Sequence, residues 1–454
     1  MVGGGLAGLF TASELVAAGV DDVVVVDAPE HPGGITRTIV EDGYSLEPAA
    51  GSFSLPHPVL SPILERCDID VVPARGASVR HVFVDGRLVP LRPGPSALLA
   101  PLVSLGAKAS ALAEPVRGRR AADASEESLA AFLRRRFGAG AGNMIAWLMA
   151  SGVYAGDPER LSAVSAFPLL EALEREHGSL ILGGLRARRA RSAQTRPGPH
   201  IPVGGMTALA ESLARSLDGR FRGGFAVDAV SRVGGRWEVS GPDTITADVV
   251  VLAVRPETAS ELLGEDFGGG AVLARSAREH TVAQDDTRCS RARHGRPEPV
   301  LVVGLGGRGA PLPEGFGLLV GPDEGLATRG VLFESSYAPW RAPEGSWLAK
   351  VIVGGAGGRV PDGDDESVVS VVEEEVSRIL SSELEPEVGI VVRHLDGIPQ
   401  YEVGHRAWLG EVDAWLRARP GVYVTGWGYR GVGVASLAMD AARLAREISV
   451  TSTG

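Results

Sequence analysis

The strongest constraint on the fold lies in residues 3–8, which read Gly-Gly-Gly-Leu-Ala-Gly and fit the pattern G-x-G-x-x-G. A helix is predicted directly after them, over residues 9–18, and Gly19 ends it. Residues 23–26 are consecutive valines, a β-branched run typical of a buried parallel strand. The run leads into Asp27, nineteen residues after Gly8.

Each part of this pattern has a physical role in holding a dinucleotide. Glycines allow a tight turn and let the backbone approach a pyrophosphate, and the free N–H groups at the start of the helix attract that anion. A carboxylate at the end of the second strand accepts hydrogen bonds from a ribose. The spacing therefore predicts dinucleotide binding rather than a plain glycine-rich turn. The predicted contact residues of this segment are Gly3, Gly5, Leu6, Ala7, Gly8 and Asp27. Because only Met1 and Val2 precede the glycines, the first strand is expected to contribute little to the sheet.

Composition limits the class of protein further. The chain has 454 residues, 44% of them hydrophobic and 22% charged, which is enough for a large core and two or three domains. Its net charge of −11 disfavours a nucleic-acid partner. The two cysteines, Cys67 and Cys289, exclude a disulfide scaffold and a four-thiolate site, and we expect no metal. No apolar run is long enough to cross a bilayer and the first residues lack the features of a secretory signal, so a cytoplasmic location is expected.

A second pair of glycines, Gly33-Gly34, follows closely after Asp27-Ala28. This arrangement behind G-x-G-x-x-G resembles the FAD-dependent oxidases of the amine-oxidase and protoporphyrinogen-oxidase type. The resemblance implies FAD rather than NAD as the cofactor. The arginine that this family carries before the second glycine pair is His31 in this chain.

Further motifs extend the resemblance over nearly the whole chain. Residues 151–162 read Ser-Gly-Val-Tyr-Ala-Gly-Asp-Pro-Glu-Arg-Leu-Ser, a string that resembles protoporphyrinogen oxidases and that amine oxidases do not share. Residues 397–405 and 426–433 resemble the C-terminal flavin motif of the family. The resemblance implies an α/β (α+β) fold with a Rossmann-like FAD-binding domain of discontinuous segments, a mixed-sheet substrate domain and a helical insertion. The implied boundaries are 1–60 with 200–263 and 405–454 for the FAD-binding domain, 61–85 with 264–404 for the substrate-binding domain, and 86–199 for the helical domain.

The resemblance also implies a reaction and a set of site residues. The reaction is the oxidation of a porphyrinogen (protoporphyrinogen IX or coproporphyrinogen III) to a porphyrin in haem biosynthesis, by six-electron removal with O2 as the acceptor. The cofactor-binding residues implied in addition to the glycine turn and Asp27 are Ala28, Gly33, Gly34, Val227, Trp427, Gly433 and Val434. The implied substrate-binding residues are Arg80 for a propionate, Gly152 and Gly156 for backbone contact, and Phe316, Leu319, Leu332 and Ile352 for the apolar macrocycle. No catalytic acid or base is nominated, since the cofactor carries the chemistry, and His405 is expected to be structural.

Several positions depart from the family pattern and leave other functions open. Ala49, Ala50 and Gly51 replace the family's Gly-Pro-Asn. Trp427 replaces a small amide beside the flavin, and residues 271–295 are charged where the family tends to be apolar. The alternatives are a divergent amine-oxidase-type enzyme that acts on another substrate, and a flavin-fold protein with impaired catalysis.

The helical insertion leaves two questions open. Residues 96–113 carry leucines among small residues, for which core packing is the default prediction. The resemblance implies instead a helical domain at the membrane surface, with peripheral contact to the inner face of the cell membrane. Arg134, Arg135 and Arg136 end a predicted helix and are expected to be solvated. Monomer and homodimer are both compatible with the sequence.

Overall fold

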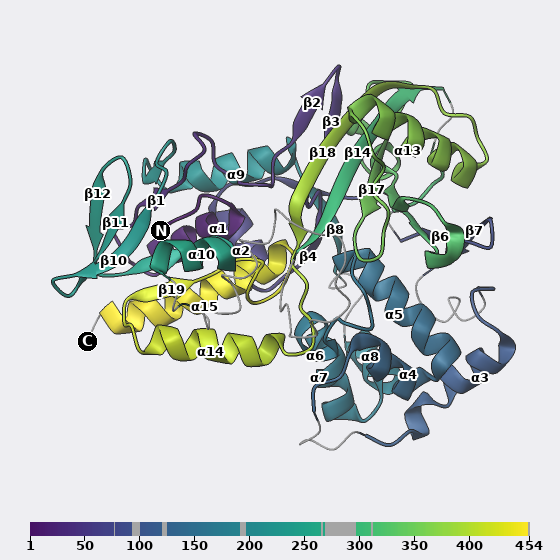
Figure 1. Ribbon diagram of the computed structural model, residues 1–454, viewed down its shortest axis with the longest axis horizontal. Coiled ribbons are helices and arrows are strands. Elements are labelled where there is room, and N and C mark those ends of the chain that lie inside the picture. Colours follow the sequence, from purple (N-terminus) through teal and green to yellow (C-terminus); the bar gives the residue numbers. More distant parts are fainter. Residues whose placement is uncertain are drawn as a thin grey trace.

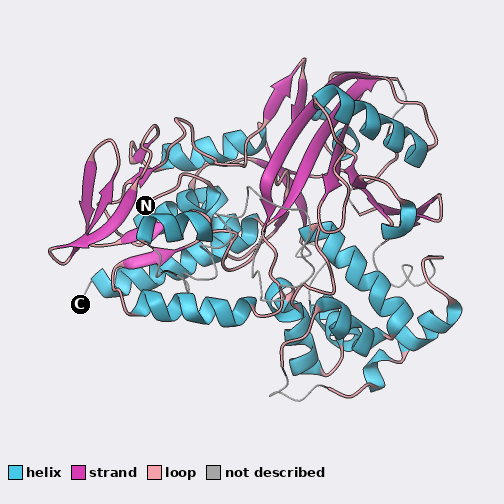
Figure 2. Ribbon diagram, in the orientation of Figure 1, coloured by secondary structure: helices cyan, strands magenta, loops and turns pink. Residues whose placement is uncertain are grey.

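The computed structural model describes residues 1–76, 78–92, 100–119, 125–190, 197–264, 267, 297–309 and 312–452. These residues form a parallel sheet with flanking helices, a larger mixed sheet and a group of helices, at the left, upper right and lower right of Figure 1. The predicted mixture of helices and strands is therefore confirmed (Figure 2). Leu98, Leu99, Cys289 and the charged stretch 271–295 lie outside the described residues. None of the described helices has the length and apolar character needed to cross a membrane.

Val2 lies at the centre of the parallel sheet and connects its two halves. Two parallel strand pairs flank this residue: β1 (Val25–Val26) with β9 (Phe221–Arg222), and β13 (Val250–Leu252) with β19 (Val422–Val424). Val2 forms parallel bridges to Val26 and to Leu252, so it connects the two pairs. The sequence predicted that the residues before the glycine turn would contribute little to the sheet, and that prediction is wrong, because Val2 holds the central position of the sheet. The ends that follow the parallel strands, where the predicted cofactor residues lie, therefore meet at one edge.

Helices cover both faces of the parallel sheet. On one face, α1 (Leu6–Ala17) packs against α9 (Gly205–Ser216) and α15 (Val434–Ser452). Leu9 and Phe10 of α1 are fully buried there, and burying a large apolar side chain contributes about 1.5–3 kcal/mol. On the other face lie α10 (Pro256–Leu263) and α14 (His405–Arg417). The other elements of this part are α2 (Leu60–Arg66), β4 (Phe53–Leu55), β5 (Val71–Pro73), β8 (Gly198–Pro202), β10 (Ala229–Val233), β11 (Arg236–Ser240) and β12 (Thr244–Ala247).

The mixed sheet has seven strands in the order β18-β14-β17-β16-β15-β6-β7. Their bounds are β6 (Arg80–Val84), β7 (Arg87–Leu91), β14 (Glu298–Arg308), β15 (Gly317–Val320), β16 (Thr328–Leu332), β17 (Ser346–Gly354) and β18 (Pro386–Ile398). The helix α13 (Asp365–Leu380) buries one face of this sheet, where Val351 and Val353 belong to the shared core. Because side chains alternate along a strand, Ile352 points to the opposite face. The short elements nearby are β2 (Ile39–Glu41), β3 (Tyr44–Leu46), η4 (Pro322–Glu324), α12 (Glu334–Tyr337) and η5 (Pro339–Arg341).

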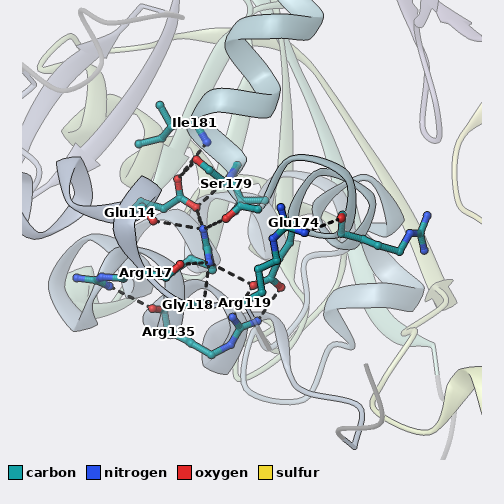
Figure 3. Close-up of polar contacts among 12 residues, drawn as sticks. Glu114, Arg117, Gly118, Arg119, Arg135, Glu174, Ser179 and Ile181 are labelled. Atoms are coloured by element: carbon teal, nitrogen blue, oxygen red, sulfur yellow. Dashed lines mark hydrogen bonds and ion pairs between the residues drawn. The ribbon is translucent and has the colours of Figure 1, made fainter. Parts of the chain in front are cut away.

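The helical group corrects one prediction. Its elements are α3 (Leu105–Leu112), η2 (Glu114–Val116), α4 (Leu129–Phe137), α5 (Ala139–Tyr154), α6 (Ala163–Ala166), α7 (Pro168–His177) and α8 (Leu180–Ala190). Arg136, expected to be solvated, has a fully buried side chain that pairs with the equally buried Glu114. Glu114 accepts hydrogen bonds from the N–H groups of Leu180 and Ile181 at the start of α8 (Figure 3). Arg136 donates at 2.8 Å to the carbonyl of Gly178, just after α7. The pair therefore satisfies the ends of two helices, and this compensates its loss of water.

Candidate functional site

The glycine turn at the edge of the parallel sheet accepts no side chain at two of its positions. Gly3 has φ +104°, and a Cβ there would lie 2.6 Å from the carbonyl oxygen of Ala253. A Cβ on Gly8 would lie 1.9 Å from the carbonyl oxygen of Gly3. The first turn of α1, which includes Leu6 and Ala7, has no side-chain cap and no acidic residue. Its N–H groups are thus left to an external anion, as a pyrophosphate requires.

Asp27 and the second glycine pair lie against this turn. The Asp27 carboxylate accepts a hydrogen bond from the N–H of Ala28 at 3.1 Å. Burial raises the pKa of Asp27, and hydrogen bonds from the backbone N–H groups of Gly4 and Ala28 oppose that rise. The N–H of Gly33 donates to the carbonyl of Gly4 at 2.8 Å, and a Cβ on Gly34 would lie 3.3 Å from the Cα of Gly5. The two glycine motifs are therefore in direct contact, although 24 to 30 residues separate their members in sequence.

Val227 and His31 lie on the segments that border Asp27. Val227 is half-buried in the connection between β9 and β10, and it packs against the core beneath the sheet. Two residues earlier, the N–H of Phe225 donates to the carbonyl of Asp27 at 2.8 Å. His31, where the resembled family has an arginine, is exposed. The structure thus brings Val227 near the edge that carries Asp27.

The loop between β19 and α15 closes the same edge from the C-terminal side. It contains Trp427, whose indole N–H is buried and has no hydrogen-bond partner among the described residues. Gly433 has φ +101° and directly precedes Val434, the first residue of α15. A buried donor without an acceptor is costly, so Trp427 marks a place where a bound group would supply one.

Tyr401 fixes this loop, a role that the sequence did not reveal. Its hydroxyl donates to the carbonyl of Trp427 and accepts the N–H of Gly431 at 2.7 Å. The ring of His405 stacks on Tyr401 with centroids 4.1 Å apart, and its Nε2 lies 2.9 Å from the carbonyl oxygen of Tyr429. His405 thus supports the loop through packing and backbone contact, consistent with its expected structural role. The signal in sequence was the closeness of Tyr401 to His405 in one motif, which by itself names no partner.

A buried cluster of four charges joins the parallel-sheet part to the mixed sheet. Glu47 and Glu334 face Arg341 and Lys350, and every one of these side chains is at most 5% exposed. Lys350 Nζ donates to the carbonyl of Glu47 at 2.9 Å and to that of Ala49 at 3.2 Å. Burial alone would raise the pKa of Glu334, but the charges of Arg341 and Lys350 hold it below its ordinary value. Burial raises the pKa of Glu47 despite the same cations.

The same cluster holds the segment in which the chain departs from the family pattern. Arg341 donates to the carbonyl of Gly51 at 2.9 Å, so Ala49 and Gly51 are each fixed through backbone oxygens. A Cβ on Gly51 would lie 3.1 Å from the Cβ of Glu47. The segment is therefore held by main-chain contacts, and these do not need the side chains that the family carries.

The face of the mixed sheet opposite α13 brings the predicted substrate residues together. Gly317 is paired with Arg80 on one side and with Leu332 on the other, which places both side chains on one face. The Arg80 guanidinium lies 5.8 Å from the centre of the Phe316 ring. A Cβ on Gly330, the partner of Leu319, would lie 3.3 Å from Leu319.

The end of α5 reaches this face. A Cβ on Gly152 would lie 3.7 Å from Leu319, and one on Gly156 would lie 2.2 Å from the side-chain oxygen of Gln400. Gly152 therefore adjoins the apolar face, whereas Gly156 is pressed against the connection to α14. Two hollows, of about 520 and 410 Å³, lie elsewhere, beside Trp340 and beside Arg430. The titratable residues of the described chain form no cluster suited to a metal ion.

The glycine turn, Asp27, the second glycine pair and the C-terminal loop meet at one edge of a parallel sheet, the arrangement typical of dinucleotide-binding folds. Residues 6–449 match the family described as flavin containing amine oxidoreductase, and the chain belongs to that family. It is accordingly a flavin-dependent oxidoreductase. The family resemblance seen in the motifs is confirmed.

Individual relatives match nearly the full length. Coproporphyrinogen III oxidase of Bacillus subtilis (strain 168) is 28% identical over 463 residues, covering 96% of this chain and 94% of the relative. The chloroplastic protoporphyrinogen oxidase of Oryza sativa subsp. japonica is 28% identical over 442 residues, covering 89% of this chain and 79% of the relative. A solved structure from Exiguobacterium sp. 255-15 has a TM-score of 0.79 and 23% identity, covers 99% of this chain and 98% of its own, and shows the same fold.

Proposed function

We propose that this chain is an FAD-dependent porphyrinogen oxidase of haem biosynthesis, acting on coproporphyrinogen III or protoporphyrinogen IX. The observation that carries the proposal is the similarity to the B. subtilis coproporphyrinogen III oxidase, which extends over 94% of that relative and leaves no large part of either chain unmatched. The loop at residues 151–162, which amine oxidases do not share, supports the same substrate class. A protoporphyrinogen oxidase from rice matches at equal identity, so the proposal spans both substrates.

FAD fits the residues at the sheet edge. Asp27 would accept from the ribose hydroxyls, and the uncapped start of α1 would bind the diphosphate beside Gly33 and Gly34. Trp427 would donate its orphan indole N–H to the flavin end, and Val227 would border the adenine. When bound, FAD would accept the hydride from the substrate and pass the electrons on to O2.

The residues of the mixed sheet would bind and orient the substrate. A porphyrinogen is a large apolar macrocycle with carboxylates at its rim, so it needs apolar contacts and a cation. Leu319, Leu332 and Ile352 would supply the contacts, and Arg80 would pair with a propionate. In the complete reaction the porphyrinogen loses six hydrogen atoms, and three O2 are reduced to three H2O2. We assign no catalytic acid or base.

The proposal is tested with the purified holoprotein. We expect a yellow protein that releases FAD on heat denaturation and that forms a fluorescent porphyrin from at least one of the two porphyrinogens, with H2O2 produced alongside. Arg80→Leu should raise KM for that porphyrinogen with little change in kcat. The exposed Arg308, at the far end of β14, offers a matched control variant, Arg308→Leu. A yellow protein that oxidises neither porphyrinogen but oxidises primary amines would refute the proposal.

We further propose a cytoplasmic location with contact between the helical group and the membrane surface. Leu105, Leu112 and Val116 of α3 and η2 are 83%, 61% and 87% exposed, and exposed apolar side chains on neighbouring helices suit the interfacial layer of a bilayer. Flotation of the protein with liposomes tests this, and binding that persists in a Leu105→Ser/Val116→Ser variant would refute it. Light scattering on the same samples distinguishes a monomer from a homodimer. The division into three domains at the predicted boundaries stays a prediction, testable by limited proteolysis.

A further inference from the structure

A β-bulge in β16 contains Arg329. In β16, Thr328 is paired with Val353 and Gly330 with Ile352, so Arg329 is one extra residue between two consecutive pairs. Val353 belongs to the core under α13, and Ile352 points to the opposite face. The two residues of a bulge face one residue of the partner strand and share its side. The register alone allows Arg329 to share the side of Val353 or of Ile352, and the contacts of its guanidinium decide between them. Arg329 donates to the carbonyl of Ala356, whose N–H donates to the carbonyl of Ala155 at the end of α5. Because Gly152 of α5 adjoins Leu319 on the face of Ile352, Arg329 reaches toward that face.

The Arg329 guanidinium is half-buried and has no carboxylate partner among the described residues. It donates from Nε to the carbonyl of Gly354 at 3.2 Å and from Nη2 to that of Ala356 at 3.2 Å. Burial lowers the pKa of Arg329, the effect expected where no anion compensates the charge. A guanidinium has five N–H donors, so two carbonyls leave donors for an anionic ligand. The arrangement differs from Arg136 and Arg341, whose buried charges are neutralised by glutamates.

Arg329 lies at the end of the apolar face opposite to Arg80. The N–H of Ala356 donates to the carbonyl of Ala155 at 2.8 Å, which places Arg329 beside the end of α5. Arg80 is level with Leu332 through their common partner Gly317. Strand rise and strand spacing then put the Cα atoms of Arg80 and Arg329 about 14 Å apart, with the apolar side chains between them.

We infer that Arg329 is a second carboxylate-binding residue of the substrate site and that it favours a tetrapyrrole with carboxylates on opposite edges. Coproporphyrinogen III carries a propionate on each of its rings, so it can engage Arg80 and Arg329 at once. Protoporphyrinogen IX carries propionates on two adjacent rings only, and its vinyl groups would face one of the two cations. The inference rests on the proposed function for the choice of substrate. It predicts that this chain prefers coproporphyrinogen III.

The test measures binding separately from turnover. Coproporphyrin III and mesoporphyrin IX, a tetracarboxylate and a dicarboxylate, are titrated into the holoprotein and into Arg329→Gln, Arg329→Lys and Arg393→Gln. Arg393 is a matched control because it lies on the same sheet and pairs with Asp365 of α13 on the opposite face. We expect Arg329→Gln to weaken coproporphyrin III binding about 10- to 100-fold and to leave mesoporphyrin IX within about 2-fold. Arg329→Lys should recover part of the loss, and Arg393→Gln should change neither.

Turnover separates the inference from the proposed function. With coproporphyrinogen III, Arg329→Gln should raise KM by a similar factor with kcat nearly unchanged. Equal loss of both porphyrins, or loss of neither, would overturn the inference, since a purely structural arginine would not discriminate between ligands. A further outcome is a wild-type protein that binds coproporphyrin III and oxidises neither porphyrinogen, while Arg329→Gln binds coproporphyrin III selectively more weakly. In that case the inference stands and the proposed function fails. If the wild type oxidises both porphyrinogens and Arg329→Gln changes neither porphyrin binding nor KM, the proposed function stands and the inference fails.

Discussion

The buried four-charge cluster gives the sharpest stability prediction. Glu334→Gln removes one of its two negative charges and leaves Arg341 and Lys350 facing Glu47 alone. Breaking a buried pair by removing one partner costs about 3–5 kcal/mol, because the remaining charge stays buried without compensation. Lys350→Met has the opposite effect on the charge and should cost a similar amount. It also leaves the carbonyls that Lys350 contacts without a donor.

The double variant Glu334→Gln/Lys350→Met restores electrical neutrality and keeps the volumes similar. Glu334 and Lys350 are 3.3 Å apart, so their effects should be coupled by about 2–3 kcal/mol. We therefore expect the double variant to be less destabilised than the sum of the two single variants. Urea unfolding followed by circular dichroism at neutral pH measures all four proteins. Strictly additive losses would refute the argument, because they would mean that the two charges do not stabilise one another.

Three further outcomes follow from other parts of the structure. Gly8→Ala should abolish flavin binding, because the added Cβ would collide with the Gly3 carbonyl. The flavin-to-protein absorbance ratio of the purified protein measures this, and the control Gly184→Ala, where the Cβ enters open space on α8, should leave the ratio unchanged. Glu114→Gln should destabilise the wild-type fold by about 3–5 kcal/mol near neutral pH. Burial would raise the pKa of Glu114, but hydrogen bonds from its serine and arginine partners hold that pKa below the ordinary value. The stability that ionised Glu114 contributes is therefore present above the ordinary glutamate pKa and is lost as the pH falls through the pKa of the folded state. An acid-unfolding curve of the variant should lack this pH-dependent loss of stability. In a chain that begins at Met1, burial lowers the pKa of the α-amine from 8.0 to about 5. Between pH 8 and pH 5 only the unfolded state takes up a proton, so the free energy of unfolding should fall by at most about 4 kcal/mol over this range. N-terminal acetylation should remove this pH dependence.

Short-range patterns made the fold and the cofactor edge predictable. The valines before Asp27 and the spacing of the glycines depend on neighbours within thirty residues, and local geometry dictates both. Arg136 was misjudged because its partner Glu114 lies in another element, and no local pattern distinguishes a buried arginine from a solvated one at a helix end. The position of Arg329 could not be predicted for a different reason, because the side of the sheet on which it lies depends on the register of two strands. The substrate residues were named through family resemblance alone, and their common face follows from pairings that no single segment contains.

The central position of Val2 has a consequence for how the protein is made. Its bridges join residue 2 to Val26 and to Leu252, and the next strand of the sheet is not complete until residue 424. The helix α15, which packs against α1, comes later still. During synthesis the glycine turn therefore lacks the strands and the helix that support it until nearly the whole chain has left the ribosome. Flavin uptake would then act as a late checkpoint that reports a finished chain, and nascent chains stalled before β19 should remain colourless.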